Sequence, residues 1–387
     1  MAERALAHIE KIEWIRPIEG ADNIELIGVL GWVCIAKKGE FNVGDMAVYI
    51  EIDSKCPETD ERFAFLANKK FKVKIMKLGK FKVISQGLAL PLSLFPELQD
   101  KKIGDDVTEA LKITYASEED AARKTNKIDP NAKYKSMAKR RPKLFANPIV
   151  RRIMRYNIGR KIMFMLFGRK KDNPKKFPDW IVKTDETRIE NAPFYLQSIE
   201  KWIKTEKCDG TSCTFAVDRL KKGNNKFDFI VCSRNVRQAD REQACYHESN
   251  IYWELADKYD IEKILTQFAT ENNYNRVVLQ GEGVGSVQGN PYKFTENKLF
   301  VFNLIIDGTR LGTVEMADFC KSHGLTSVPI IDTAYELPKT MEEMKLEADG
   351  YSELNPKVKR EGFVYRSIDG QQSFKNVSRE YLLKHNG

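Results

Sequence analysis

Apolar and polar residues alternate over short stretches in the first hundred residues, which is the pattern of half-buried strands. The stretches Ile24–Leu30 and Trp32–Ala36 are separated by one glycine, and Met46–Ile52 follows the turn signal Gly44-Asp45. A further stretch, Phe71–Lys77, alternates between basic and apolar residues. We expect about five short strands, which suit a small barrel, and the OB-fold is the commonest such barrel that binds nucleic acid.

This barrel is either purely structural or grips a substrate through an exposed basic face. The lysines that would populate that face are Lys72, Lys74, Lys77, Lys80 and Lys82.

The pattern changes over residues 106–176, which we interpret as a basic, partly helical linker segment. Residues 149–168 have helical periodicity with arginines on one side. Between Lys133 and Lys176 there are sixteen Lys or Arg residues and one acid, Asp172, so this stretch carries +15 and the rest of the chain −6. Such a segment suggests a polyanion partner, most simply nucleic acid. A solvated basic linker and a membrane-surface helix are the alternatives; we favour a helix that packs on a domain and faces nucleic-acid phosphates.

Residues 177–387 mix strands and helices. The pattern predicts helices at 189–203 and 250–269, and apolar strands at 277–280, 299–306 and 362–366. Because strands and helices do not alternate regularly, we expect an α+β domain of antiparallel sheets. The predicted organisation is a barrel at residues 1–105, the basic segment at 106–176 and the α+β domain at 177–387.

Composition adds constraints on the class of protein. A hydrophobic content of 42% and a charged content of 31% are typical of a globular protein. No apolar run approaches membrane-spanning length, and the first residues lack the pattern of a signal peptide, so we expect no membrane partner. The seven cysteines include no Cys-x-x-Cys pair, which makes a zinc site improbable and indicates reduced thiols in an intracellular, reducing compartment.

The candidate chemistry centres on Lys207, in the stretch Glu206-Lys207-Cys208-Asp209-Gly210 between two apolar, strand-like segments. A lysine held rigidly in a tight turn beside a carboxylate is a candidate nucleophile, although a surface turn would have the same pattern. Further charged residues stand at the ends of later predicted strands, and together they would line one phosphate-and-metal pocket. These residues are Arg234, Glu282, Glu361 and Lys375.

This ordered series resembles the motifs of the covalent nucleotidyltransferase superfamily, which includes ATP-dependent ligases and RNA-capping enzymes. The stretch Lys207-Cys208-Asp209-Gly210 looks like the nucleophile motif. The later motifs are matched, in order, by Arg234, Glu282, Phe302, Glu361 and Lys375.

Other stretches narrow the resemblance to a branch of RNA ligases that carries an N-terminal OB domain. They are residues 183–188, before the nucleophile, and residues 281–285 and 288–292, after it. DNA ligases and capping enzymes place their OB domain after the fifth motif, whereas twelve residues follow Lys375 here. The resemblance covers residues 1–105 and 177–387 and is poor over the basic segment.

One position departs from the family pattern. Many relatives have two lysines one residue apart in the fifth motif, whereas this chain has Lys375 and then Val377. Either the second phosphate contact is missing, or another basic residue such as Arg379 or Lys384 supplies it.

The resemblance implies a three-step reaction. Lys207 attacks the α-phosphorus of ATP to form lysyl-AMP, AMP passes to the 5′-phosphate of an RNA strand, and a 3′-OH then displaces AMP. The lysine must be deprotonated near neutral pH, and we expect nearby cations to lower its pKa. Mg²⁺ or Mn²⁺ would offset charge on the α-phosphate, held by Glu361 and, by resemblance, Asp209 and Glu282.

The remaining candidates are expected to bind the nucleotide, together with Asp209, Gly210 and Glu282. Phe302 would stack on adenine or serve as ordinary core. Arg234 would contact the ribose or the substrate phosphate, and Lys375 the α-phosphate. Arg188 would reach the leaving pyrophosphate or form a surface ion pair. Glu206 would orient adenine through its backbone or be a strand-edge charge.

We therefore predict an ATP-dependent RNA ligase for RNA repair or nick sealing, acting on nicked duplexes or RNA ends, with a monomer favoured. One alternative is a nucleic-acid-binding protein with a degenerate ligase domain. Another is a ligase that acts on DNA or mixed RNA/DNA nicks.

Overall fold

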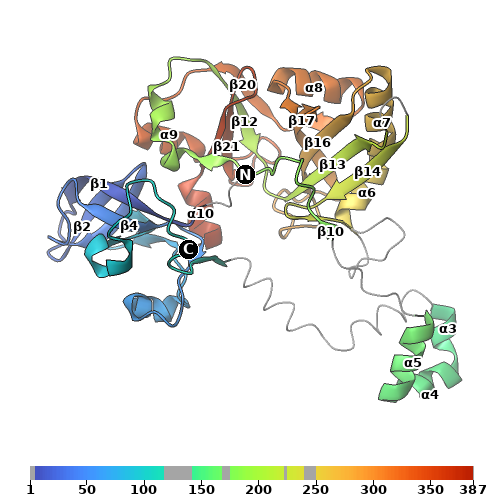
Figure 1. Cartoon of the computed structure of the whole chain (residues 1–387), viewed down its shortest axis with the longest axis horizontal. Coiled ribbons are helices and arrows are strands. Elements are labelled where there is room, and N and C mark those ends of the chain that lie inside the picture. The colour runs from blue at the N-terminus through green and yellow to red at the C-terminus, as the bar shows by residue number, and fades with distance from the viewer. Residues whose placement is uncertain (1–4, 117–141, 168–174, 222–224, 239–249, 387) are drawn as a thin grey trace.

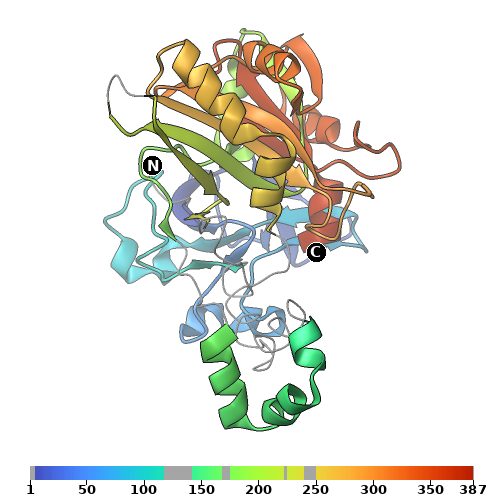
Figure 2. The same cartoon turned by 90° about the vertical axis from the view of Figure 1, so that its right-hand side faces the viewer.

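The computed structural model describes residues 5–116, 142–167, 175–221, 225–238 and 250–386 of the chain (Figure 1). Figures 1 and 2 show an N-terminal β domain and a larger C-terminal domain of sheets and helices. Figure 1 also shows short helices that lie apart from both domains. The fold class is the predicted one, an all-β barrel followed by an α+β domain built mainly on antiparallel sheets.

The N-terminal barrel is organised around one long, bent strand. Strand β1 pairs with β4 through residues 7–11 and with β2 through residues 12–17, and its register shifts between Ile12 and Trp14. Such a bulge bends a strand and lets one sheet curl toward a barrel. The order of the main sheet is β3-β2-β1-β4-β8. Its strands are β1 (Ala7–Pro17), β2 (Ile24–Val29), β3 (Trp32–Lys37), β4 (Met46–Ile50) and β8 (Leu88–Pro91).

Two short strand pairs and three short helical turns complete this domain. Strands β5 (Ser54–Lys55) and β9 (Thr114–Tyr115) pair, as do β6 (Ile75–Leu78) and β7 (Val83–Gln86). The 3-10 helices are η1 (Glu61–Lys69), η2 (Leu92–Leu94) and η3 (Pro96–Leu98).

Two sequence predictions need correction in this domain. The strand predicted at 71–77 begins only at Ile75, because Lys70 and Phe71 have φ angles of 54° and 59° and end the extended backbone. The core also continues past residue 105, since Val107 and Ile113 are buried with the barrel residues. The domain therefore ends near residue 116.

The described part of the basic segment consists of three short helices. Asn147 caps the second one by accepting a hydrogen bond from the Ile149 N–H, and Pro148 occupies its first position. Phe145 and Met163 form their small shared core. None of the helices described in this structure is long and apolar enough to cross a bilayer. The three helices are α3 (Pro142–Ala146), α4 (Pro148–Met154) and α5 (Asn157–Phe167).

The rest of the predicted linker, 117–141 and 168–174, lies outside the described residues. The expected packing of residues 149–168 on a domain is not seen for the residues described, because α4 and α5 lie apart from both domains (Figure 1).

Two sheets form the C-terminal domain. The larger has the order β10-β15-β14-β13-β16-β17-β18, with β19 beside β17, and the smaller the order β11-β22-β21-β12-β20. The larger contains β10 (Lys175–Lys176), β13 (Thr211–Arg219), β14 (Phe227–Cys232), β15 (Val236–Arg237), β16 (Arg276–Val284), β17 (Lys298–Ile306), β18 (Thr309–Arg310) and β19 (Thr326–Ser327). The smaller contains β11 (Thr187–Arg188), β12 (Trp202–Lys207), β20 (Ile330–Tyr335), β21 (Gly362–Ser367) and β22 (Ser373–Val377).

Three helices pack on the larger sheet, where Phe215 and Leu279 of the sheet meet Leu255 and Leu265 of the helices. The helix predicted at 250–269 is interrupted at Asp260, whose φ is 48°. The three helices are α6 (Ile251–Lys258), α7 (Ile261–Glu271) and α8 (Thr313–Ser322).

The helix predicted at 189–203 is wrong. Pro193 interrupts this stretch, which forms the 3-10 turns η4 (Ile189–Asn191) and η5 (Pro193–Gln197) before β12 begins at Trp202. A proline in a helix interior removes a backbone donor and clashes with the preceding turn.

The turns η4 and η5, which form in place of this helix, hold the two domains together. The Gly31 N–H of the barrel donates to the Glu190 carbonyl at 2.8 Å. A Cβ atom at Gly31 would lie 2.7 Å from the Cα of Glu190, so this approach requires glycine. The Glu190 side chain is fully buried and lies 2.6 Å from Nζ of the equally buried Lys345, in helix α9 (Met341–Ala348). The ion pair between Lys345 and Glu190 thus fixes the turn that contacts the barrel.

The C-terminal helix α10 (Arg379–Asn386) extends this contact. Leu382 is buried in the same cluster as Trp32 and Ile75 of the barrel. The end of the chain therefore belongs to the core of the N-terminal domain.

We expect Lys345→Ala to destabilise the fold by about 3–5 kcal/mol, because it leaves the Glu190 carboxylate buried without its cation. Chemical unfolding measures this change. Lys339→Ala, at an exposed site, is the control and should cost no more than about 0.5 kcal/mol. Similar losses of unfolding free energy in both variants would show that the ion pair between Lys345 and Glu190 does not stabilise the fold in this way.

A second buried charge cluster lies inside the barrel. His8 Nδ1 is 2.7 Å from Glu10 Oε1, and Nε2 is 3.6 Å from Glu51 Oε1. Burial lowers the pKa of His8, but the two carboxylates outweigh it and raise this pKa from 6.5 to about 9. The protonated ring thus stabilises the fold fully below pH 6.5, and this stabilisation is lost as the pH rises toward 9.

Between pH 6.5 and pH 9 the wild type should therefore lose more stability than His8→Gln, by up to about 3 kcal/mol. Denaturant unfolding of both proteins at the two pH values gives the difference. Parallel losses would show that His8 does not carry this pH dependence.

Candidate active site

A cavity of about 560 Å³ lies where the two sheets of the C-terminal domain meet the barrel and α10. All ten residues predicted from the sequence to act or bind line this one cavity. They are Arg188, Glu206, Lys207, Asp209, Gly210, Arg234, Glu282, Phe302, Glu361 and Lys375.

Lys207 stands where the chain crosses from one sheet to the other. It is the last residue of β12, in the smaller sheet, and β13 of the larger sheet begins at Thr211. Tyr292 holds the turn by accepting a hydrogen bond from the Asp209 N–H at 2.6 Å. A Cβ atom at Gly210 would lie 2.4 Å from the Gly283 carbonyl oxygen. Only glycine allows this turn to close against β16.

The charges nearest to Lys207 are carboxylates. Its Nζ lies 2.9 Å from Oε1 of Glu361. Burial lowers the pKa of Lys207, but Glu361, Glu282 and Asp209 outweigh it and raise this pKa above its ordinary value. Burial in turn raises the pKa of Glu282 to about 8. The expectation that nearby cations lower the pKa of Lys207 is therefore wrong for the protein groups described, because acids surround the amine.

The same three carboxylates were predicted to hold a metal ion. Among the residues described, no group of three or more His, Cys, Asp or Glu side chains is spaced to hold one alone. Mg²⁺ often binds through one or two carboxylates and completes its shell with water and substrate phosphates. The three carboxylates therefore suit a cation that arrives together with a phosphate. They do not form a site for a resident metal. They belong to Glu361, Glu282 and Asp209.

Four basic side chains also line the cavity. Asp185 pairs with both Arg234 and, at 3.6 Å, Lys375. Arg188 and Arg366 are 7% and 3% exposed, so neither is a surface residue. Each has one acidic partner, but Nε and Nη1 of both have no hydrogen-bond partner among the described residues. Buried guanidinium donors that line a cavity suit an anionic acceptor such as a phosphate.

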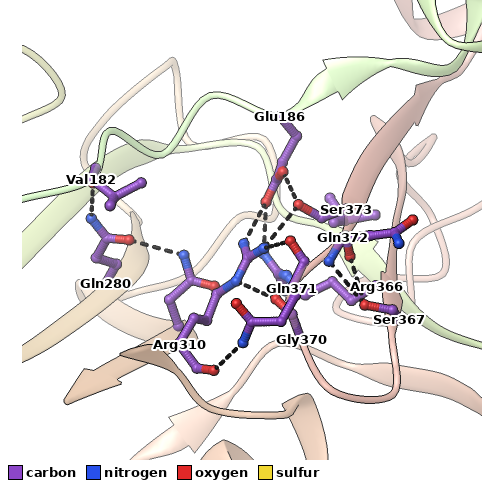
Figure 3. A network of polar contacts seen from close by, with 12 residues as sticks. Val182, Glu186, Gln280, Arg310, Arg366, Ser367, Gly370, Gln371, Gln372 and Ser373 are labelled. Carbon is purple, nitrogen blue, oxygen red and sulfur yellow. Dashed lines mark hydrogen bonds and ion pairs between the residues drawn. The ribbon is translucent and has the colours of Figure 1, made fainter. Parts of the chain in front are cut away.

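A polar network around Glu186 supports the basic side chains of the cavity (Figure 3). Glu186 accepts hydrogen bonds from Arg366 at 3.1 Å and from the Ser373 hydroxyl, and Nη1 of Arg310 lies 3.7 Å away. Burial raises the pKa of Glu186, but Arg366, Ser373 and Arg310 outweigh it and hold this pKa below its ordinary value. The charged carboxylate thus ties the segment that carries Asp185 and Arg188 to β18, β21 and β22.

An apolar part of the cavity is suited to a flat base. Phe302, Val328 and Val364 line it, and Phe302 is only half-buried, as a ring that stacks on a ligand would be. The second interpretation of Glu206, as a charge at a strand edge, is wrong. Glu206 is 1% exposed, and its carboxylate accepts hydrogen bonds from the Ser352 hydroxyl and the Glu353 N–H.

Some cavity residues were not foreseen. Asp53 and Tyr115 come from the barrel, and Asp53 lies 3.4 Å from Arg188. No sequence signal could have placed them, because their position depends on how the domains dock. Of the basic residues proposed to replace the missing lysine, Arg379 pairs with Glu342, and neither it nor Lys384 lines the cavity, whereas Val377 does.

Tyr381 of α10 was also missed. Its hydroxyl hydrogen-bonds to the Asp209 carboxylate, and burial, with the nearby acids, raises its pKa so that it stays a donor. The C-terminal helix, which packs into the barrel core, thus reaches the turn that carries Lys207.

Comparison with known proteins gives two family matches. The model of an OB-fold domain matches residues 6–92, and the model of the RNA ligase family matches residues 200–384. No curated protein matches the chain.

Solved structures of Naegleria gruberi RNA ligase are similar over the whole chain. The structure with PPi is 31% identical with a TM-score of 0.75, covering 99% of both chains. A variant with ATP and Mn is 30% identical with a TM-score of 0.74, covering 98% of this chain and 99% of that one. Another, with AMP and Mn, is 30% identical with a TM-score of 0.74, covering 99% of both.

Removing the Tyr381 hydroxyl should leave Asp209 poorly oriented beside Lys207. We expect Tyr381→Phe to slow the reaction of Lys207 with ATP by about tenfold, since a hydrogen bond to a charged group contributes about 1.5–3 kcal/mol. Single-turnover labelling with α-labelled ATP measures the rate. Tyr351→Phe, at an exposed tyrosine of the same domain, should react as the wild type does. An unchanged rate in Tyr381→Phe would contradict this role.

Proposed function

Because the chain belongs to the RNA ligase family, its reaction is the ATP-dependent joining of RNA ends, and we propose that Lys207 is the nucleophile of that reaction. Nζ of Lys207 attacks the α-phosphorus of ATP, and an N–P bond forms as the bond to pyrophosphate breaks. The 5′-phosphate of an RNA strand then takes AMP from the lysine. Finally a 3′-OH attacks that phosphate, and AMP leaves as the strand is sealed.

The observation that carries this proposal is the placement of one lysine among three carboxylates in a cavity that basic side chains also line. Glu361, 2.9 Å from Nζ, is placed to take the proton that the amine must lose. Lys375 and Arg234, which pair with Asp185, are placed to bind the phosphate under attack. Arg188, whose buried Nε and Nη1 have no hydrogen-bond partner among the described residues, suits the leaving pyrophosphate.

Glu361, Glu282 and Asp209 are the residues that would hold Mg²⁺ or Mn²⁺ together with the phosphate. When bound there, the cation offsets the carboxylate charge that raises the pKa of Lys207 and stabilises charge on the α-phosphate. The relatives solved with ATP and Mn support this pairing of nucleotide and metal. The apolar wall at Phe302 and Val364 receives adenine.

We further propose that the RNA is a nicked duplex or a pair of RNA ends and that the reaction serves RNA repair. The supporting feature is the barrel, because OB-folds bind oligonucleotides and this one contributes Asp53 and Tyr115 to the cavity. A reducing compartment is proposed from the cysteines, since those described are all free and buried, at positions 34, 56, 208, 213, 232 and 320.

Lys207→Ala should abolish the covalent label that the wild type acquires from α-labelled ATP with Mg²⁺ or Mn²⁺, because the alanine has no amine to attack phosphorus. Denaturing electrophoresis shows the labelled band, and sealing of a nicked RNA duplex should fall with it. Lys201→Ala, at an exposed lysine of the same stretch, is the matched control and should label normally. Full labelling of Lys207→Ala would show that another residue is the nucleophile.

A further inference from the structure

Helix α5 carries an apolar stripe that faces solvent. Ile158, Ile162, Met165 and Leu166 follow the spacing i, i+4, i+7 and i+8, which places them on one face of the helix. Their exposed fractions are 74%, 46%, 78% and 62%. A surface helix of a globular protein normally turns such a stripe toward a core, so this stripe requires another apolar partner.

The stripe is not part of the small core that holds the three helices together. That core uses Phe145 and Met163 instead. Helix α4 adds two more exposed aliphatic side chains, Ile149 at 69% and Ile153 at 38%. Neither domain covers them, because the helices lie apart from both domains (Figure 1).

The charges beside the stripe are all of one sign. Arg151, Arg152, Arg155 and Lys161 are exposed, and residues 142–171 contain nine Lys or Arg residues and no Asp or Glu. The partner of this surface therefore presents both apolar groups and negative charge.

We propose that α4 and α5 lie on the surface of an anionic lipid bilayer, with the stripe among the acyl chains and the basic side chains on the lipid phosphates. A bilayer surface offers both chemistries to a basic amphipathic helix. RNA phosphates would pair with the arginines but would leave the aliphatic stripe in water, and RNA bases stack on aromatic rather than aliphatic side chains. The helices lie in the plane of the surface, because none of those described can cross a bilayer.

This placement replaces the expectations that the segment has no membrane partner and that it faces nucleic acid. It also separates the membrane contact from the catalytic cavity, because α4 and α5 contribute no lining residue. Ligation would then take place at a membrane surface.

The test is flotation of the full-length chain with vesicles of 70% phosphatidylcholine and 30% phosphatidylglycerol, and with vesicles of phosphatidylcholine alone. We expect the wild type to bind the anionic vesicles at least about tenfold more tightly than the neutral ones. The stripe variant Ile158→Ser, Ile162→Ser, Met165→Ser should lose about tenfold or more on anionic vesicles. The charge variant Arg151→Gln, Arg152→Gln, Arg155→Gln should lose the preference for them.

A matched control replaces three exposed aliphatic residues elsewhere, Ile103→Ser, Ile199→Ser and Leu346→Ser, and should bind vesicles as the wild type does. Covalent labelling by α-labelled ATP shows that each variant is folded, since none of the changed residues lines the cavity.

Three outcomes would overturn the proposal. The first is a wild type that binds neither vesicle, or a stripe variant that binds as tightly as the wild type. The second is a wild-type dimer in light scattering that the stripe variant abolishes, without vesicle binding, because a second copy would then cover the stripe. The third is weaker binding of duplex RNA by the stripe variant, again without vesicle binding, which would assign the surface to RNA.

Discussion

The architecture of this ligase depends on one buried ion pair. Lys345 and Glu190 are both fully buried and 2.6 Å apart, and Glu190 lies in the short turn on which the barrel rests through Gly31. A buried charge is tolerated only when its partner is present, so the turn has little freedom to move. Because Arg188 stands two residues before Glu190 and lines the cavity, the contact that joins the domains also places a basic residue of the cavity.

The cavity is consequently a product of three separate parts of the chain. The smaller sheet brings Lys207, the larger sheet brings Glu282, and the barrel with α10 brings Asp53 and Tyr381. Acids surround Lys207, and basic side chains line the same cavity, where Glu186 contacts Arg366 and Arg310 (Figure 3). Such a combination of charges suits a reaction in which an amine attacks a phosphate and a pyrophosphate leaves.

Local sequence motifs were enough to predict the cavity residues that belong to those motifs. Lys207 ends β12 and Glu361 directly precedes β21, as predicted, whereas Glu282 lies within β16 and Lys375 in the middle of β22. All four line the cavity. Asp53 and Tyr115 could not be predicted in this way, because they reach the cavity only through the docking of a separate domain. The predicted helix at 189–203 failed where Pro193 and the buried Glu190 override the local periodicity. The stripe of α5 was visible as helical periodicity, but only the structure shows that nothing described covers it.

Asp185 has a further consequence for how the site fills. Its carboxylate already pairs with Arg234 and Lys375, the two cations that we propose bind the phosphate. Phosphate entry is therefore an exchange of one anion for another rather than the neutralisation of bare positive charge. The ion pairs restrain both side chains before the nucleotide arrives, so less side-chain entropy is lost on binding. The cost is that the nucleotide must displace the Asp185 carboxylate from these cations. Because Asp185 belongs to the same chain, its effective concentration does not fall when the protein is diluted.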